Sequence, residues 1–565
     1  MQPRDEPAAQ ILASPGRLGD SRWNAVAAWA VVSGIFVAVS LWQTPLPGIN
    51  EPHYLTKARA FADPGWCERD FFLQSANAHY VFFAVVGPVT TWFCFGTVAV
   101  IGRILSLSLL ACGWNMIGRR LGLNALGSAV AASVFCGIGA TGNFSGEWII
   151  GGFEGKVPSY GFALVGVAWW LDAWTTSLRR KYALAGVFMG AAVAWHPVVG
   201  MWICIGIAIS EFARLVSRVV LRSKLSDEHV ADTSDAQPDI GRTATTSHLL
   251  VNSIVFVLSA FVVALPGLIP AAELVLSSTL EADPVDQANY IQVFWRLAHH
   301  LDPSTFPPSA WLHTAVLLTV CLAAIVFVRT KSIADRWYPL LWLLAASSVV
   351  CAAGIGIGWH SKPMLQLPDW QWRAALLKFY PFRFFDALLP ITASFAVAAA
   401  WDKLRLMKLK QVTARSVLAA ALMALSAAVI IVPGRQHHAS YTPAAFAEWQ
   451  RACEWLRQNT SADALVLGPR ESFGLKWFAH RAEYVCFKDC PQDAAGILEW
   501  NRRLWAIHGW SESSYQDESF DVEDTQRLHA DTGITHIITR RLGPFTQPPV
   551  STFGMWRVYA IAGGE

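Results

Sequence analysis

Long apolar stretches recur along this chain and set the first limit on how it can fold. A helix needs about 20 mostly apolar residues to cross the hydrocarbon core of a bilayer. Eleven stretches approach that length: 24–42, 101–118, 124–140, 159–176, 182–196, 197–212, 249–270, 310–328, 338–358, 384–401 and 416–433. The fifth and sixth meet at Pro197, which interrupts a helix, so they are two thin spans or one broken span.

The composition agrees with a membrane protein. Hydrophobic residues make up 54% of the chain and charged residues only 15%, whereas soluble domains carry about 25% charged residues. The 27 tryptophans are an unusually large share, and Trp concentrates where a bilayer meets water. We therefore expect an all-α polytopic membrane protein with about 11 transmembrane helices. The net charge of +3 and the lack of a basic, aromatic-rich cluster argue against a nucleic-acid partner.

Basic residues indicate the orientation, because Lys and Arg accumulate in cytoplasmic loops. With the amino terminus inside, they are enriched in the segments that would be cytoplasmic. This assignment requires the apolar stretch 81–97, which contains Pro88, to lie as a juxtamembrane helix without crossing. The first run could be a signal peptide, since Ala38-Val39-Ser40 resembles a cleavage site, but its length and the ten later spans favour an uncleaved anchor.

The chain then divides into three regions. Residues 1–22 form a cytoplasmic tail, 23–433 the transmembrane domain and 434–565 an extracytoplasmic α/β domain. Within the transmembrane domain, an outward loop is expected over 43–99 and a disordered cytoplasmic linker over 223–248, which is polar and has no aromatic residue.

The last region differs in kind from the rest. "ALVLG", "YVCFK", "HIITR" and "MWRVYAIAG" have the pattern of short strands, and they alternate with the helical patterns "FAEWQRACEWLRQ" and "AAGILEWNRRLWAI". This alternation predicts a small α/β layer domain. It has neither a GxGxxG motif nor a P-loop, so nucleotide binding has no support. Cysteines 453, 486 and 490 could supply a disulfide in an oxidising compartment.

Polar residues gather in the outward loops, whereas the spans contain almost no acid at mid-depth. Ionisable residues inside a membrane are typical of ion-coupled transport, so their scarcity favours chemistry at the outer membrane face. The candidate site residues are Asn50, Glu51, His53, Tyr54, Arg103, Glu147, Glu154, Lys156, His299, His300 and Arg383.

Each candidate also has an ordinary structural interpretation. Glu51 could accept a proton from a hydroxyl or be a solvated loop carboxylate, while His53 and Tyr54 could hydrogen-bond sugar hydroxyls. Arg103, Lys156 and Arg383 could pair with a phosphate or extend to lipid headgroups.

Two further groups stay open in the same way. Glu147 and Glu154 flank Gly151-Gly152, where the backbone could approach a ligand or simply turn. His299-His300 is half of a metal site at most, and none of the ten cysteines has metal-ligand spacing, so no metal is assigned.

The order of these features resembles the GT-C superfamily of membrane glycosyltransferases, which use polyprenyl-phosphate sugars. The likeness is to transferases of the lipid A aminoarabinose and protein O-mannosyl type. It is carried by "NEPHYLTKARAF", "AHYVFFAVVGPV", "GRILSLSLLACGWNMI", "GRRLGLNALGSAV" and "RRKYALAGVFMGAAVAWHP". The tail, "GPRESFGLKWFAHRAEYVCFKDCPQ" followed by "ILEWNRRL", is similar to an uncharacterised family of bacterial integral membrane proteins found in planctomycetes among others.

The GT-C resemblance implies a transferase in the bacterial inner (cytoplasmic) membrane. It would move a sugar from a lipid-linked donor to an acceptor glycan, lipid or protein outside, with Arg103 contacting the lipid phosphate, without a nucleotide and without an obligatory metal. The family's catalytic acid is the first residue of an Asp-Glu pair, and this chain has Asn50 there. Either Glu51 has taken over the role, or transfer activity is lost.

Two other functions therefore stay open. The first is a non-catalytic membrane protein on the same scaffold, whose outward domain binds envelope polymers or partners. The second is a transporter, which would be expected to show an inverted repeat; the two halves of this chain show no self-similarity.

Overall fold

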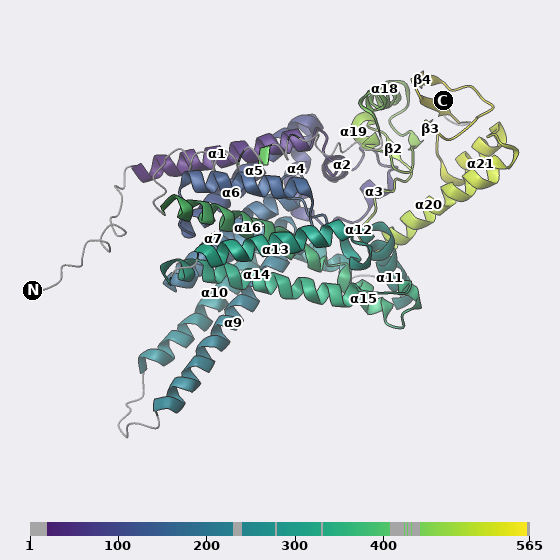
Figure 1. Cartoon of the computed structure of the whole chain (residues 1–565). Coiled ribbons are helices and arrows are strands. Elements are labelled where there is room, and N and C mark those ends of the chain that lie inside the picture. Colours follow the sequence, from purple (N-terminus) through teal and green to yellow (C-terminus); the bar gives the residue numbers. More distant parts are fainter. Residues whose placement is uncertain are drawn as a thin grey trace, which may run out of the picture.

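The computed structural model describes residues 20–229, 240–276, 280–328, 331–406, 423, 426–427, 431 and 441–561. Most of this part is helical, and a small sheet is formed by strands between residues 465 and 560. Figure 1 shows the long helices lying side by side in a bundle, with the sheet beyond one end of it and the start of α1 at the other end.

Seven helices are long and apolar enough to cross a membrane, judged by length and composition. They are α1 (Asp20–Gln43), α5 (Phe95–Arg120), α9 (Pro197–His229), α10 (Ile240–Leu276), α13 (Pro308–Val328), α14 (Lys331–Gly358) and α16 (Pro381–Leu406). The prediction of a helical, multi-pass membrane protein is therefore confirmed.

The other four predicted spans are not among these seven helices. Stretches 124–140, 159–176 and 182–196 form the helices α6 (Ala125–Thr141), α7 (Lys156–Thr176) and α8 (Arg179–Trp195), which are not among those seven. The stretch 416–433 lies almost wholly outside the described residues. The expected number of eleven spans is thus supported only as far as these seven helices.

Short helices lie between the long ones. They are α2 (Glu51–Ala62), α3 (Phe71–Gln74), α4 (Tyr80–Trp92), α11 (Ala282–Tyr290), η1 (Ile291–Arg296), α12 (Ala298–Leu301), η2 (Pro303–Thr305), η3 (Met364–Gln366) and α15 (Trp370–Leu377). With 13 residues, α4 is about 20 Å long, too short to cross a bilayer. It ends at Trp92, where Phe93 has an extended backbone. Helix α5 then begins at Phe95, six residues before the predicted span 101–118.

The segment expected to be a disordered linker over 223–248 is partly helical. Helix α9 continues to His229 and α10 begins at Ile240, while residues 230–239 lie outside the described part. Figure 1 shows both helices extending past the bundle, at the end remote from the sheet.

Small residues allow the bundle helices to pack closely, as is usual between membrane helices. At the crossing of α8 and α10, a Cβ on Gly190 would lie 2.3 Å from the carbonyl oxygen of Ala260. At the crossing of α5 and α7, a Cβ on Gly113 would lie 2.6 Å from the Cβ of Leu164. The backbones therefore touch at these glycines.

The C-terminal part contains a five-stranded mixed sheet of order β2-β1-β3-β5-β4. Strand β1 (Leu465–Leu467) is parallel to β2 (Ala482–Glu483) and β3 (His536–Thr539), and β5 (Trp556–Ala560) is antiparallel to β3 and β4 (Ser551–Phe553). The helices are α18 (Pro443–Asn459), α19 (Leu475–Ala479), α20 (Ala494–Ser514) and α21 (Val522–Thr532), with the short turn η4 (Tyr515–Asp517).

Helices cover both faces of this sheet. On one face, Trp449 of α18 packs with Val466, Ile538 and Trp556. On the other, Trp500 of α20 packs with neighbouring strand residues such as Leu465 and Ile537. The expected α/β layering is present, but "YVCFK" is not a strand, because the chain leaves β2 at Glu483 and turns toward the bundle. All ten cysteines are free, so the disulfide is absent.

Replacing Gly190 by alanine should destabilise the bundle, because the new methyl group would collide with the backbone of α10. Overpacking of this kind costs about 1–3 kcal/mol, which outweighs the roughly 1 kcal/mol by which Ala improves helix propensity. Thermal unfolding of the detergent-solubilised protein measures the effect. Gly34→Ala is the matched control, since a Cβ there meets nothing within 4 Å. Equal melting temperatures for both variants would contradict the packing described.

Candidate functional site

A cavity of about 1090 Å³ lies between the bundle and the C-terminal part. Its walls come from the end of α1, the start of α2, the connection between α6 and α7, the η1–α12 region, the start of α16 and the loop after β2. The cavity therefore lies at the end of the bundle that carries the sheet (Figure 1).

Most of the candidate residues come together here. The following line the cavity: Asn50, His53, Tyr54, Glu147, Glu154, Lys156, His299, His300 and Arg383. Glu51 and Arg103 do not line it.

Glu51 and Arg103 instead form a buried ion pair. Arg103 Nε lies 2.7 Å from Glu51 Oε1 and Nη2 lies 2.8 Å from Oε2. The same carboxylate accepts hydrogen bonds from the backbone N–H groups of Gly48 (2.6 Å) and Phe153 (2.7 Å). Arg103 also donates to the carbonyl of Thr44. Neither side chain has more than 1% exposure.

This geometry gives Glu51 no access to a substrate and Arg103 no access to a phosphate. We therefore assign both residues a structural role in place of the expected catalytic and phosphate-binding roles. Gly152 has a related explanation, because a Cβ there would lie 2.9 Å from Glu51 Cγ. The glycine therefore allows the backbone to approach Glu51. From the sequence, a close approach to a ligand was one of two explanations for the Gly151-Gly152 pair.

The two remaining carboxylates form a network at the cavity wall. Asn50 Nδ2 donates to Glu154 Oε2 at 2.7 Å. Lys156 Nζ lies 3.5 Å from Glu154 and 3.7 Å from Glu147. Arg383 Nε lies 2.8 Å from Glu147 Oε2. Two carboxylates thus alternate with two cations.

Asp386 holds the Glu147 segment in place. Its carboxylate accepts from the backbone N–H groups of Phe144 (2.7 Å), Ser145 (2.9 Å) and Glu147 (2.9 Å). Arg383 and Asp386 lie near the start of α16, so this one helix positions both a cavity cation and the loop that carries its partner.

Two cavity cations were not among the candidates. Arg296 Nη2 donates to the carbonyl of Lys488 at 3.1 Å, and its guanidinium lies 4.9 Å from the ring of Phe487. Within the described part of the chain, neither Arg296 nor Lys488 forms an ion pair with a carboxylate. Burial, together with the nearby Arg296 charge, lowers the pKa of Lys488 to about 8.

The two residues differ in how far the sequence could reveal them. Arg296 belongs to the polar loop, expected from the sequence to face outward, that also holds His299 and His300, so loop membership was a signal. Lys488 ends the run "YVCFK", whose pattern indicates a buried strand. Nothing in this run indicates that Lys488 lies in the same cavity as Arg296, from which it is 192 residues away in sequence.

The histidine pair does not form a metal centre with other described residues. The rings of His299 and His300 lie 4.0 Å apart, and His300 Nδ1 donates to the carbonyl of Ser145. Burial, reinforced by the neighbouring His299, lowers the pKa of His300 to about 3. A neutral His300 is therefore expected at the cavity wall.

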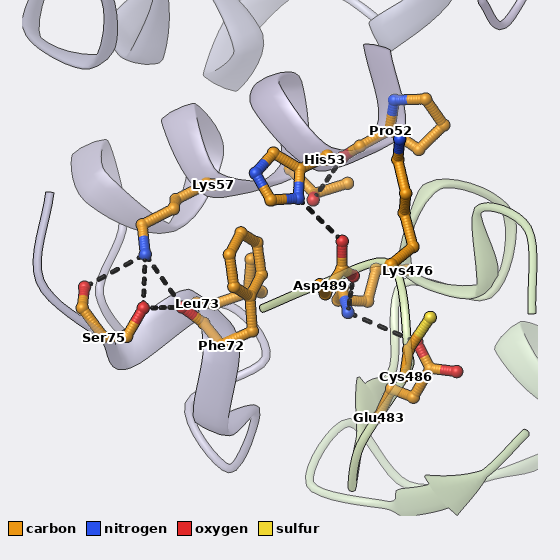
Figure 2. Close-up of polar contacts among 12 residues, drawn as sticks. Pro52, His53, Lys57, Phe72, Leu73, Ser75, Lys476, Glu483, Cys486 and Asp489 are labelled. Carbon is orange, nitrogen blue, oxygen red and sulfur yellow. Dashed lines mark hydrogen bonds and ion pairs between the residues drawn. The ribbon is translucent and has the colours of Figure 1, made fainter. Parts of the chain in front are cut away.

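A second polar cluster joins α2 to the C-terminal part (Figure 2). His53 Nδ1 lies 2.9 Å from Asp489 Oδ1. Lys476 Nζ lies 2.5 Å from Asp489, 3.3 Å from Glu483 and 3.3 Å from Asp70. One buried ammonium group is thus surrounded by three carboxylates.

This cluster is better suited to the ammonium than to a metal. Donor atoms of Glu483, Cys486 and Asp489 lie within 4.8 Å of one another and could hold an ion. The Lys476 ammonium, however, already contacts both of those carboxylates. A cation bound there would face a buried like charge, so the residues do not fit a metal.

Burial and charge set the protonation of this cluster. Burial raises the pKa of Glu483 to about 7, although Lys476 opposes the rise. Burial would also raise the pKa of Asp489, but the Lys476 charge and the His53 hydrogen bond outweigh it and hold that pKa well below its ordinary value. Burial lowers the pKa of His53. A neutral His53 therefore donates to an ionised Asp489.

Lys57, one turn further along α2, donates its ammonium hydrogen bonds to the nearby segment that contains α3. Its Nζ donates to the carbonyls of Phe72 (2.9 Å) and Ser75 (3.1 Å) and to Ser75 Oγ (2.6 Å), as Figure 2 shows. Burial lowers the pKa of Lys57 to about 7.

Comparison with known proteins identifies only part of the chain. Residues 447–507 match a domain of unknown function (DUF6798). No curated protein matches the chain. The matched segment runs from within α18 into α20, and it includes Lys476, Glu483, Lys488 and Asp489. The matched segment thus supplies Lys488 to the cavity wall and Lys476, Glu483 and Asp489 to the ion cluster.

Breaking the Glu51–Arg103 pair should destabilise the protein strongly, because either single change leaves a buried charge without its partner. We expect Arg103→Met and Glu51→Gln each to lose about 3–5 kcal/mol of stability. The double variant Glu51→Gln/Arg103→Met should lie closer to wild type than either single change, because it leaves no buried charge without a partner. Chemical or thermal unfolding in detergent measures the effect.

The control for this cycle is an exposed pair. Arg457 and Glu454 lie 3.6 Å apart with about half of each side chain exposed, and Arg457→Met should change stability by less than about 1 kcal/mol. A Glu51→Gln variant with wild-type stability would rule out the structural role assigned to Glu51.

The Glu483 carboxyl should make stability depend on pH. Its pKa in the folded protein, about 7, exceeds its ordinary value of 4.5, so the folded state binds this proton more tightly than the unfolded state. The contribution is fully present below pH 4.5 and is lost as pH rises to 7. We expect Glu483→Gln to remove about 3 kcal/mol of this change in stability between pH 4.5 and 7, measured by unfolding at several pH values. An unchanged slope would contradict the assignment.

Proposed function

We propose that the chain is a GT-C-like membrane glycosyltransferase, which moves a sugar from a polyprenyl-phosphate donor to an acceptor on the extracytoplasmic side. The observation that supports it best is the cavity itself. Four cations and two carboxylates line one hollow at the end of an apolar bundle: Lys156, Arg296, Arg383, Lys488, Glu147 and Glu154.

The cations suit a lipid-linked phosphate. Lys156 and Arg383 are compensated by the two carboxylates, whereas Arg296 and Lys488 have no described carboxylate partner. An unpaired guanidinium and ammonium group attract a phosphate ester through charge-assisted hydrogen bonds. They would also stabilise the negative charge that develops on the phosphate as it leaves.

Glu154 is the best-placed base. Asn50, at the position of the family's catalytic acid, donates to it at 2.7 Å, so a carboxylate is available where the family pattern requires one. In the proposed step, Glu154 takes the proton from an acceptor hydroxyl. The hydroxyl oxygen bonds to the anomeric carbon, the bond from that carbon to the phosphate oxygen breaks, and polyprenyl phosphate leaves.

The arrangement of charges supports the proposed orientation. Arg120, Asp172 and Lys181 meet at the junctions of α5, α7 and α8, with Arg120 3.5 Å and Lys181 2.7 Å from Asp172. This basic region lies where α5 ends and α8 begins, while the cavity lies where α16 begins and α1 ends. Positive residues mark the cytoplasmic side, so the cavity would face outward in the cytoplasmic membrane of a bacterium.

A second candidate is a non-catalytic receptor for lipid-linked or envelope glycans. The observation in its favour is that the family's acid is an amide, Asn50, and that Glu51 is locked in an ion pair. Such a protein would bind a polyprenyl-phosphate sugar at the same cations without transferring it.

Changing Glu154 to glutamine should reduce transfer at least about 100-fold, because an amide cannot accept the proton. The assay supplies proteoliposomes with a panel of radiolabelled polyprenyl-phosphate sugars and follows label in the acceptor. Donor binding should persist in this variant. The matched control is Glu523→Gln, which changes an exposed carboxylate on α21 that lines neither the cavity nor the second pocket.

Wild-type transfer rates in the Glu154→Gln variant would rule out this base. Donor binding by the wild-type protein without turnover of any donor would favour the receptor.

A further inference from the structure

A second pocket, of about 410 Å³, lies within the C-terminal part. Leu467, Gly468 and Arg470 line it on one side, and Thr539 and Leu542 on another. Leu467 is the last residue of β1, and Gly468 and Arg470 follow it; Thr539 is the last residue of β3, and Leu542 follows it. The pocket therefore lies at the carboxyl ends of two adjacent parallel strands.

The strand order makes this a topological switch point. From β1 the chain passes to β2 on one side, and it later returns to β3 on the opposite side of β1. Connections that leave in opposite directions open a crevice at the strand ends, and α/β proteins bind ligands there. The position of the pocket is thus the one that the topology favours for a ligand.

The lining is aromatic with a few polar groups. Trp295, Trp505 and Trp510 contribute indoles, and Arg470, His508, Ser511 and Thr539 contribute polar atoms. Trp505 is 59% exposed although it lies beside the pocket. A large apolar side chain left this open is available to stack on a ligand.

This chemistry fits a pyranose ring. The C–H groups on one face of a pyranose carry partial positive charge and pack on the negative face of an indole, while the hydroxyl groups need hydrogen-bond partners at the ring edge. Arg470 makes no ion pair with a described carboxylate, and its guanidinium lies over Phe487 at 4.9 Å. Its N–H groups are therefore available to hydroxyl oxygens.

A nucleotide fits less well. The turn after β1 begins Gly468-Pro469-Arg470, and a proline there removes a backbone N–H that a phosphate would need. A peptide strand would pair with a free sheet edge, and this pocket lies at the strand ends.

The pocket and the large cavity are lined in part by consecutive residues of η1. Trp295 lines the pocket and the next residue, Arg296, lines the cavity. The ring of Phe487 contacts both the guanidinium group of Arg470 and that of Arg296, each at 4.9 Å. A glycan held in the pocket would therefore be close to the cavity that holds the proposed donor.

We propose that this pocket binds a pyranose glycan and serves as an acceptor subsite next to the large cavity. The acceptor role rests on the proposed transferase function, whereas glycan binding does not.

The test measures binding of three trisaccharides, chitotriose, maltotriose and trigalacturonic acid, to the purified full-length protein in detergent by calorimetry. At least one should bind saturably. Trp505→Ala should weaken that binding about tenfold, which corresponds to the loss of one good aromatic contact, and Arg470→Ala should weaken it as well. Trp92→Ala is the control, because that indole is 84% exposed and lies on α4, outside the pocket.

The proposal would be overturned if none of the three trisaccharides bound, or if the Trp505→Ala and Trp92→Ala variants bound equally well. Binding of a hydrophobic tripeptide that depends on Trp505, in place of the sugars, would assign the pocket to peptides and would also overturn it.

The two proposals can fail separately. Glycan binding that depends on Trp505 in a protein without transfer activity supports the pocket and removes the acceptor role. Transfer that depends on Glu154 in a protein whose glycan binding ignores Trp505 removes the pocket alone.

Discussion

The buried ion pair of Glu51 and Arg103 is the contact on which the geometry of the cavity depends. Removing two charges from water costs several kcal/mol for each ion unless hydrogen bonds compensate, and here two backbone N–H groups and the guanidinium saturate the carboxylate. Those groups come from α5, from the turn before α2 and from the chain before α7. Because the pair joins these segments, the preceding residue, Asn50, is held toward Glu154 at the cavity wall.

A second charged contact brings the C-terminal part onto this frame. Lys476 neutralises Asp489 and Asp70, and Asp489 in turn accepts from His53 on α2. Since Lys488 directly precedes Asp489, docking at this cluster also places an unpaired ammonium group in the cavity. The segment matched by the family of unknown function contains both residues, so it contributes to the cavity as well as to the sheet.

The proposed chemistry follows from how these two contacts divide the charges. The buried pair removes one carboxylate and one guanidinium from the site, and the Lys476 cluster uses three more carboxylates. What remains in the cavity has more cations than carboxylates, as a phosphate ligand requires. In the GT-C resemblance the acid belongs to the outward loop after the first span, whereas here the residue at that position, Asn50, donates to the carboxylate of Glu154, 104 residues later in the chain.

The sequence by itself determined the membrane class, the position of most long helices and the layered C-terminal part, because hydropathy and strand or helix periodicity are local properties. It also named most of the cavity's carboxylates and cations, since polar groups in loops between apolar helices have few other places to lie. Only the tertiary structure decided between neighbours: Asn50 faces the cavity and Glu51 faces Arg103, although both belong to one polar loop. It alone revealed Lys488, whose apolar surroundings in sequence suggest a strand. The physical reason is that the direction of a side chain at a helix start, and the partner that compensates a buried charge, depend on segments distant in the chain.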